Sequence, residues 1–567
     1  MKKKWWHEKI GYQIYPKSFL DTNGDGVGDL TGVIEKLPYL EQLGVDILWL
    51  SPVYPSPMVD NGYDISDYEN IDPRFGTLED MDRLIAEAKK KNISIIMDLV
   101  VNHCSDQHAW FRKAIADPKG PYGDYFSLKE GKDGKEPNNW RSYFGGSVWE
   151  KLPGQENLYY YHAYAKEQPD LNWENPALRE EIYKMVNWWL DRGIAGFRID
   201  AIINIKKDLT WEDLPVDGPD GRGFLTNSIT RMQKRDGGTK NGIGVFLREL
   251  KERCFAPHDA FTVGEVFEVD REQLEEFIGE DGYFSTMFAF DPIQSYKKGT
   301  CQCEFDRNMN PDEWKRDVFV NQKLLGDIAF EANIIENHDM ARGATIYIPD
   351  EDYGFASISA LAGLQVLQRG MPFLYQGQEI GMTNCPFELE DIDDIMTLDN
   401  YRYAVACGFP EEKAFAGCAR ESRDNARTPM QWSDAENAGF TTGKPWLKVN
   451  PNYPEINVAR QEKEYGSVLN FYRRLLCFRK SEEYRDLLTY GTFEPMYEDQ
   501  ERIFAFKRTL GKQCLTVICN ESSAERFLTL KEDYEEVVFV NLPQVTRIGD
   551  NLILHPYQLI VVETTKK

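Results

Sequence analysis

Short apolar segments alternate with amphipathic segments along most of the chain, and this alternation is the feature that most restricts its fold. Helix-like stretches such as 78–91, 175–192 and 358–369 separate the apolar segments. Strands that are apolar along their whole length and joined by helices are typical of a parallel sheet buried on both faces. Eight such units predict an α/β protein with a (β/α)₈ TIM barrel. The predicted strands are 12–15, 46–50, 93–100, 196–200, 260–265, 286–290, 333–336 and 372–375.

The spacing of these units is uneven, which indicates segments added to the barrel. No β/α unit fits between the third and fourth strands, so we predict an inserted subdomain at 104–174. A second irregular stretch follows the eighth strand at about 376–445. Beyond residue 485 short strands with turns predict a C-terminal antiparallel β-sandwich domain at 486–567. The barrel would then comprise residues 1–103 and 175–485.

Charge and composition exclude several classes of protein. The 567 residues include 66 Lys plus Arg and 93 Asp plus Glu, which gives a net charge of −27. A phosphate backbone or an anionic membrane surface would be repelled, so we expect neither nucleic acid nor a membrane as partner. An aromatic share of 13% is typical of proteins that stack rings on sugars, although a Tyr-rich core explains it equally well. The basic N-terminus lacks the apolar stretch of a signal peptide.

Ten cysteines are scattered along the chain without a CxxC pair. Cys301 and Cys303 are too close together for ordinary metal or disulfide spacing. Free thiols in a reducing cytoplasm are the expected state, and we expect a monomer or a weak oligomer.

Polar residues at the ends of the predicted strands indicate where the chemistry takes place, because functional side chains of such barrels come from the carboxyl ends of the strands. Several carboxylates at one barrel mouth, without a Cys/His cluster, favour hydrolysis of a glycosidic bond, which needs a general acid and a second carboxylate. Arg198 shares a strand face with Asp200 and should keep it ionised. Glu265 would have to be protonated, which requires an apolar or anionic neighbourhood. The residues concerned are Asp98, Asn102, His103, Arg198, Asp200, Glu265, His338 and Asp339.

Four segments that contain these residues resemble, in order and spacing, the signature regions of the α-amylase superfamily, glycoside hydrolase family 13. They are 98–103 (DLVVNH), 196–200 (GFRID), 264–266 (GEV) and 337–339 (NHD). Residues 168–172 (QPDLN) and 422–432 (SRDNARTPMQW) are similar to motifs of its oligo-1,6-glucosidase and α-glucosidase subfamily. The resemblance extends from Tyr12 to the C-terminal β domain.

The resemblance implies a role for each matching residue. Asp200 matches the nucleophile of a retaining mechanism, Glu265 the acid/base and Asp339 the carboxylate that steadies the transition state. Asp60 and Tyr63 match the residues that hold the terminal glucose, and Arg427 would close the pocket behind it together with Asp60. A closed pocket implies exo action on a small oligosaccharide or disaccharide substrate. The substrate-binding residues implied are Asp60, Tyr63, His103, Phe144, Tyr164, Gln168, Arg198, Ala201, His338 and Arg427.

A glycine-rich acidic loop at 21–29 (DTNGDGVGD) begins like an EF-hand loop. Oxygen ligands at alternating positions suit Ca²⁺. Position 12 of the motif is Gly32 where an EF-hand has Glu, and an acidic surface turn is the alternative interpretation. We expect the bound Ca²⁺ ion to be structural, because the loop is distant in sequence from the carboxylates and hydrolysis needs no cofactor. The expected metal ligands are Asp21, Asn23, Asp25, Val27 and Asp29.

The linkage that is cleaved stays open at this point. The motifs favour isomalto-oligosaccharides with α-1,6 linkages, whereas Ala201, after the nucleophile, is more typical of α-1,4 activity in the subfamily. Sucrose isomerases, trehalose synthases and trehalose-6-phosphate hydrolases share the three carboxylates and remain alternatives. The RLDRD segment of many sucrose isomerases is missing ahead of strand seven. A non-catalytic transporter subunit would lack part of the three carboxylates.

Overall fold

The computed structural model describes residues 2–218, 220–225, 242–267, 271–294, 296–297, 304 and 307–564. Its central sheet has eight strands, hydrogen-bonded in the order β11-β10-β8-β3-β2-β1-β13-β12 with every pair parallel. A parallel bridge between Phe288 and Ala332 connects the two edges, so the sheet forms a nearly closed barrel. The eight predicted strands are confirmed. Their bounds are β1 Gly11–Ile14, β2 Ile47–Leu50, β3 Ser94–Val100, β8 Gly196–Asp200, β10 Phe261–Gly264, β11 Thr286–Met287, β12 Ala332–Asn333 and β13 Met371–Tyr375.

Local sequence signals explain where the outer helices begin and end. Thr77 and Asp80 form a reciprocal capping box at the start of α2. The side chain of Asn175 accepts from the first N–H groups of α4, and Gly193 ends this helix at a φ of 111°, which suits glycine. The helices that accompany the barrel are α1 Leu30–Leu43, α2 Leu78–Lys90, α4 Pro176–Arg192, α6 Gly244–Leu250, α7 Arg271–Ile278, α8 Asp291–Gln294, α9 Pro311–Leu325, α10 Gly343–Tyr347, α11 Phe355–Leu367, α15 Val458–Gln461, α16 Val468–Arg479 and α17 Arg485–Tyr490.

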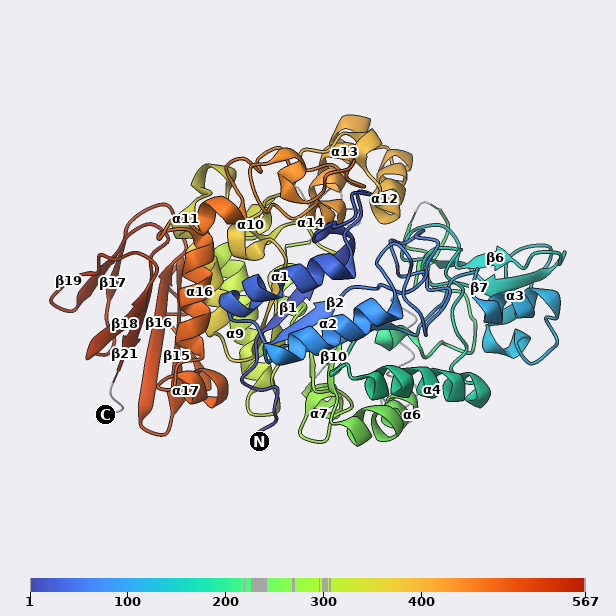
Figure 1. Ribbon diagram of the computed structural model, residues 1–567, viewed down its shortest axis with the longest axis horizontal. Coiled ribbons are helices and arrows are strands. Elements are labelled where there is room, and N and C mark those ends of the chain that lie inside the picture. The colour runs from blue at the N-terminus through green and yellow to red at the C-terminus, as the bar shows by residue number, and fades with distance from the viewer. Residues whose placement is uncertain are drawn as a thin grey trace.

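Two additions lie at opposite ends of the molecule (Figure 1). One is the subdomain inserted after β3, with α3 (Ala109–Ala116) and a small antiparallel sheet of order β4-β7-β6. The other is the C-terminal domain, in which a five-stranded and a three-stranded sheet enclose a separate apolar cluster. The strands are β4 Leu128–Glu130, β5 Trp140–Arg141, β6 Trp149–Lys151, β7 Leu158–Tyr161, β14 Thr492–Met496, β15 Ile503–Leu510, β16 Gln513–Asn520, β17 Arg526–Thr529, β18 Glu536–Val540, β19 Thr546–Ile548, β20 Asn551–Leu554 and β21 Leu559–Glu563.

The inserted subdomain is larger than the single segment that the sequence suggested. A stretch that follows β8 returns to it, where β9 (Gly223–Phe224) pairs with β5 and Trp211 stacks on Trp140. Trp211, Leu214 and Leu225 belong to the same apolar cluster as the subdomain strands. The segments before and after β8 therefore pack together in one subdomain.

The stretch at 376–445 was expected to be irregular, and this expectation is wrong in part. It contains α12 (Ile395–Ala406), α13 (Glu411–Arg420) and the single turn α14 (Asp424–Arg427). Asp394 caps the first of these helices by accepting from two backbone N–H groups. The sequence of α12 has no clear apolar face, which is why a search for amphipathic segments missed it.

Two further findings concern the chain as a whole. None of the described helices combines the length and the apolarity needed to cross a membrane. The eight cysteines in the described ranges are free thiols, and Cys301 and Cys303 lie outside those ranges.

Candidate active site

The register of the barrel strands brings the predicted polar residues to one mouth. Asp98 on β3 lies beside Arg198 on β8, and Val100 lies beside Asp200. On the other side of β8, Gly264 of β10 lies beside Ile199. Glu265 follows Gly264 directly, and its N–H donates to the carbonyl of Ile199 at 3.0 Å. Residues that are distant in sequence are therefore neighbours across three adjacent strands.

Arg198 is shared by three carboxylates, a group that we call the Arg198 cluster. Its Nη1 donates to Asp98 and to Asp200, at 2.7 Å each. Its Nη2 donates to Glu265 at 2.9 Å. The side chain of Asp98 is fully buried, while those of Asp200 and Glu265 are 10% and 15% exposed. Asp98 therefore serves to hold the guanidinium, and the other two carboxylates remain accessible to a substrate.

Arg198 lowers the pKa of Asp200 as expected, but the expectation that it thereby keeps Asp200 ionised is not met, because the net shift is upward. Burial raises the pKa of Asp200 well above its ordinary value, and the carboxylates of Glu265 and Asp98 raise it further. Arg198 opposes this shift. One positive charge divided among three carboxylates cannot offset both the loss of water and their mutual repulsion.

A strained residue follows Asp200. Ala201 has a φ of 43° and a ψ of 30°, a left-handed conformation that is uncommon for residues other than glycine. In this conformation its N–H donates to Oε2 of Glu265 at 2.8 Å. Ala201 therefore lies within the site through its backbone, and Glu265 receives two hydrogen bonds on one oxygen.

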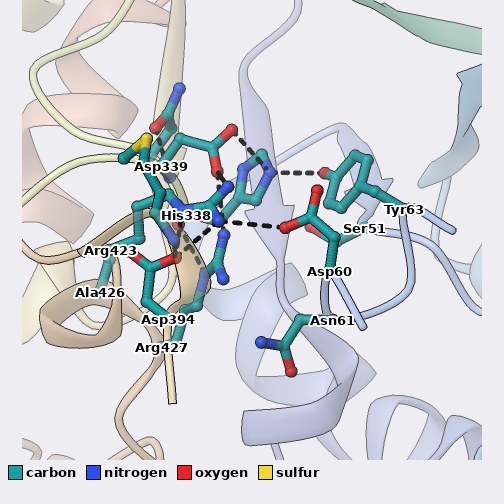
Figure 2. Close-up of polar contacts among 12 residues, drawn as sticks. Ser51, Asp60, Asn61, Tyr63, His338, Asp339, Asp394, Arg423, Ala426 and Arg427 are labelled. Carbon is teal, nitrogen blue, oxygen red and sulfur yellow. Dashed lines mark hydrogen bonds and ion pairs between the residues drawn. The ribbon is translucent and has the colours of Figure 1, made fainter. Parts of the chain in front are cut away.

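On the opposite side of the mouth, His338 lies between Tyr63 and Asp339 (Figure 2). The His338 ring stacks on the Tyr63 ring at 5.2 Å and 11°. Gln13 donates to Nδ1 of His338 at 2.8 Å, which leaves the proton on Nε2, 3.0 Å from a carboxylate oxygen of Asp339. The Tyr63 hydroxyl donates to Asp98 at 3.0 Å. His338 and Tyr63 thus connect Asp339 to the Arg198 cluster.

Asp339 belongs to a second group of charged residues, which we call the Arg423 cluster. Its members are Arg423, Arg427, Asp339, Asp60 and Asp394. Arg427 donates to Asp339 at 3.0 Å, and Arg423 contacts the same oxygen at 3.4 Å. Burial would raise the pKa of Asp339, but His338 and the two guanidinium groups prevail and hold it well below its ordinary value. The Asp339 side chain is 30% exposed, so this carboxylate too can contact a substrate.

Asp60 forms its ion pair with Arg423, at 3.0 Å, whereas Arg427 donates to Asp339 (Figure 2). Arg423 also donates twice to Asp394, at 2.6 and 2.9 Å. Asp394 is fully buried. Neither Arg423 nor Asp394 was singled out as a site residue. The signal was present, since Arg423 belongs to the motif at 422–432.

The inserted subdomain supplies the rest of the wall around Asp60. Gln168 donates to Asp60 at 3.1 Å and contacts His103 at 3.2 Å. The ring of Tyr164 lies 5.2 Å from that of His103. Phe144 lies beneath the guanidinium of Arg423, at 5.2 Å. All ten predicted substrate-binding residues therefore lie in or beside the two clusters.

A cavity of about 1510 Å³ opens between the inserted subdomain and α12. Val59, Phe144 and Tyr164 line it, whereas the three accessible carboxylates do not. The aromatic residues Phe144 and Tyr164 thus lie both beside the charge clusters and at the edge of this cavity.

The loop at 21–29 holds itself together by hydrogen bonds. Asp21 accepts from the N–H groups of Asn23, Gly24 and Gly26. Asp29 caps α1 and accepts from Thr22. Its oxygen donors fit Ca²⁺ by chemical type. Within the described residues, however, no three Asp, Glu, His or Cys side chains converge as they would around a metal ion.

Comparison with known proteins agrees with this geometry. Residues 13–491 match the family described as alpha amylase, catalytic domain. The oligo-1,6-glucosidase of Halalkalibacterium halodurans is 43% identical over 92% of this chain and 91% of its own. The trehalose-6-phosphate hydrolase of Bacillus subtilis is 38% identical over 99% and 98%. Isomaltulose synthase from Klebsiella sp. LX3 has a TM-score of 0.90 and 36% identity, over 99% of this chain and 100% of its own. The chain therefore belongs to the α-amylase family of glycoside hydrolases.

Proposed function

We propose that this enzyme is a retaining, exo-acting α-glucosidase that releases glucose from the non-reducing ends of short α-1,6-linked gluco-oligosaccharides. The observation that carries the proposal is the Arg198 cluster, in which two accessible carboxylates from neighbouring strands accept from one guanidinium. Retaining glycosidases need two carboxyl groups on either side of the scissile bond, about 5–5.5 Å apart. That separation stays a prediction for Asp200 and Glu265.

In the proposed mechanism, an oxygen of Asp200 attacks the anomeric carbon while Glu265 protonates the departing glycosidic oxygen. The bond between carbon and leaving oxygen breaks as the glucosyl–Asp200 ester forms. Glu265, now ionised, then removes a proton from water, which cleaves the ester and restores both groups. The hydrogen bonds that Arg198 and the Ala201 N–H donate to Glu265 would hold its carboxyl group in one orientation during both steps.

Exo action is supported by the wall behind the glucose pocket. Asp60, Arg423 and Asp394 form a buried ion-pair chain, and Gln168 donates to Asp60 from the inserted subdomain. Separating these buried charged side chains would be costly, because each would lose its ion-pair partner. The wall therefore keeps one arrangement. A terminal glucose would contact Asp60 and Asp339 with its hydroxyl groups and would leave no room for a further sugar beyond it.

The preference for α-1,6 linkages rests on the similarity to oligo-1,6-glucosidases, while Ala201 leaves α-1,4 bonds and sucrose as further substrates. Isomerisation of sucrose is the second candidate, because isomaltulose synthase shares the fold at a TM-score of 0.90. In that case the released fructose, in place of water, would attack the Asp200 ester. Trehalose-6-phosphate hydrolysis is a third candidate, given the 38% identical relative.

A product analysis with isomaltose, maltose, sucrose, trehalose and trehalose-6-phosphate tests the proposal. We expect isomaltose to be cleaved with the highest kcat/KM and glucose to be the only product. A new disaccharide from sucrose would support isomerisation. Cleavage of trehalose-6-phosphate alone would replace the proposed substrate.

We also propose a structural Ca²⁺ ion in the loop at 21–29 and a cytoplasmic location. The loop's oxygen donors at alternating positions support the first, although its present hydrogen bonds would have to be exchanged for the ion. The free thiols support the second. If the ion binds, treatment with EGTA should lower the melting temperature and added CaCl₂ should restore it. An unchanged melting temperature would contradict Ca²⁺ binding at this loop.

A further inference from the structure

Lys207 is a buried lysine in the loop after the nucleophile strand, and only 8% of it is exposed. Its ammonium group donates to the side chain of Asn102 at 2.7 Å, to the Asp170 carboxylate and to the carbonyl of Asn204. All three donor positions of the ammonium group are therefore used inside the protein. A lysine that is almost fully buried needs a structural or functional reason, because desolvation of a charge is costly.

Asp170, the partner of Lys207, is fully buried and joins three segments of the chain. One of its oxygens accepts from the Ala163 N–H at 2.8 Å in the inserted subdomain. The other accepts from Asn102, which follows β3, at 3.0 Å. The backbone also forms an antiparallel bridge between Asp170 and His103. The pair thus fastens the exit of the subdomain to the ends of β3 and β8.

Two residues predicted to bind the terminal glucose, His103 and Gln168, lie next to this pair and to its partner Asn102. His103 follows Asn102 and contacts its amide at 3.2 Å. Gln168 lies two residues before Asp170, contacts His103 at 3.2 Å and donates to Asp60. His103 and Gln168 are 2% and 0% exposed, so neither can move without displacing the pair. Any shift of Asp170 would reach Asp60 through these contacts.

The charges around His103 also depend on Lys207. Burial lowers the pKa of His103, the carboxylates of Asp170 and Asp60 raise it, and Lys207 lowers it. The other groups around the imidazole are uncharged: the backbone of Tyr63, whose hydrogen bond raises the pKa of His103, the amides of Asn102 and Gln168, and the ring of Tyr164. Without the ammonium group, the charge of Asp170 would act unopposed and favour the protonated imidazole.

We infer that Lys207 is a positioning residue, which neutralises Asp170 and thereby holds His103 and Gln168 in the geometry that binds the terminal glucose. The inference rests on the proposed glucosidase function. Lys207 reaches no substrate in this role and acts only through residues that do.

The test compares Lys207→Met with Lys206→Met, a matched control at the neighbouring position. Lys206 pairs with the partly exposed Glu174, away from the Asp170 pair. We expect kcat/KM for isomaltose to fall on the order of 10²-fold in Lys207→Met, as for other small misplacements of binding groups. The Lys206→Met value should lie within about twofold of the unchanged enzyme, as expected for a change outside the site.

Two further measurements separate positioning from a purely structural role. In Lys207→Met the acidic limb of the pH profile of kcat/KM should move to higher pH, because His103 gains a proton there. The double variant Lys207→Met/Asp170→Asn removes both charges, so it should recover activity to within about tenfold of the unchanged enzyme and restore the profile. This variant also carries the test if Lys207→Met alone does not fold.

Equal activities and pH profiles of the two lysine variants would overturn the inference. So would a folded double variant that is no more active than Lys207→Met. Lack of activity in the unchanged enzyme would instead contradict the proposed function.

Discussion

The barrel mouth holds two charge clusters that differ in their ratio of positive to negative groups. In the Arg198 cluster, one guanidinium serves three carboxylates, and the pKa of Asp200 is raised. In the Arg423 cluster, two guanidinium groups and His338 surround Asp339, and its pKa is lowered. Both clusters use buried arginines and carboxylates, so residue type alone does not distinguish them. The ratio of positive to negative groups does.

This difference assigns the clusters to different tasks. In the Arg198 cluster burial and the neighbouring carboxylates raise the pKa of Asp200, and carboxyl groups with raised pKa values are a common feature of catalytic sites. In the Arg423 cluster two guanidinium groups hold the pKa values of Asp339 and Asp394 below their ordinary range, so these carboxylates stay ionised and keep a fixed arrangement, as a binding wall requires. We therefore expect substitutions in the Arg198 cluster to change kcat most, and those in the Arg423 cluster to change binding and stability.

The largest expected effect is that of Asp200→Asn, because it removes the nucleophile and keeps the shape. We expect kcat for isomaltose to fall by roughly 10⁴–10⁶-fold, in the range found when a nucleophile is removed. Steady-state kinetics and circular dichroism together check the prediction. Substantial hydrolysis by this variant would assign the nucleophile elsewhere.

Glu265→Gln should follow, with a loss of roughly 10²–10⁴-fold in kcat for isomaltose. The loss should be much smaller for an aryl glucoside with a good leaving group, since departure of that group needs no proton. Comparing the two substrates isolates the acid step. An equal loss with both would contradict the acid role.

Arg423→Met tests the wall. It leaves Asp60 and Asp394 buried without their partner, so we expect about 3–5 kcal/mol less free energy of unfolding. KM for isomaltose should rise more than kcat falls. The control is Arg402→Met, which removes an arginine whose side chain is 70% exposed. Denaturant unfolding measures the free energy of unfolding, and steady-state kinetics measure KM and kcat. A KM like that of the control would show that Arg423 does not contribute to the glucose pocket.

The smallest effects concern the pH dependence of stability, where the clusters should differ in sign. Asp200 has a raised pKa in the folded state, so its contribution to stability is lost as pH rises from its ordinary value through the raised one. Asp339 has a lowered pKa, so its contribution is lost as pH falls through that lowered value.

Compared with the unchanged enzyme, Asp200→Asn should therefore gain stability as pH rises above about 4, whereas Asp339→Asn should lose it as pH rises towards about 4. We expect differences on the order of 1 kcal/mol, measured by urea unfolding between pH 3 and 8. Parallel stability curves for the two variants would show that the clusters do not differ in charge balance.

The same comparison explains what the sequence could predict. The eight strands and the carboxylates at their ends follow from local patterns and from the geometry of the barrel. The raised pKa of Asp200 could not be predicted, because it depends on how many carboxylates share Arg198. Arg423 and Asp394 lie in a long stretch after β13, where no strand end marks a position. Only the folded chain brings them to Asp60.

The most direct test of the account is the anomeric form of the first product. The enzyme is mixed with an aryl α-glucoside, and proton NMR follows the released glucose before mutarotation. If Asp200 forms a covalent intermediate within the Arg198 cluster, α-glucose appears first and the β anomer follows slowly. If β-glucose appears first, the bond is cleaved with inversion and the proposed roles of Asp200 and Glu265 are wrong.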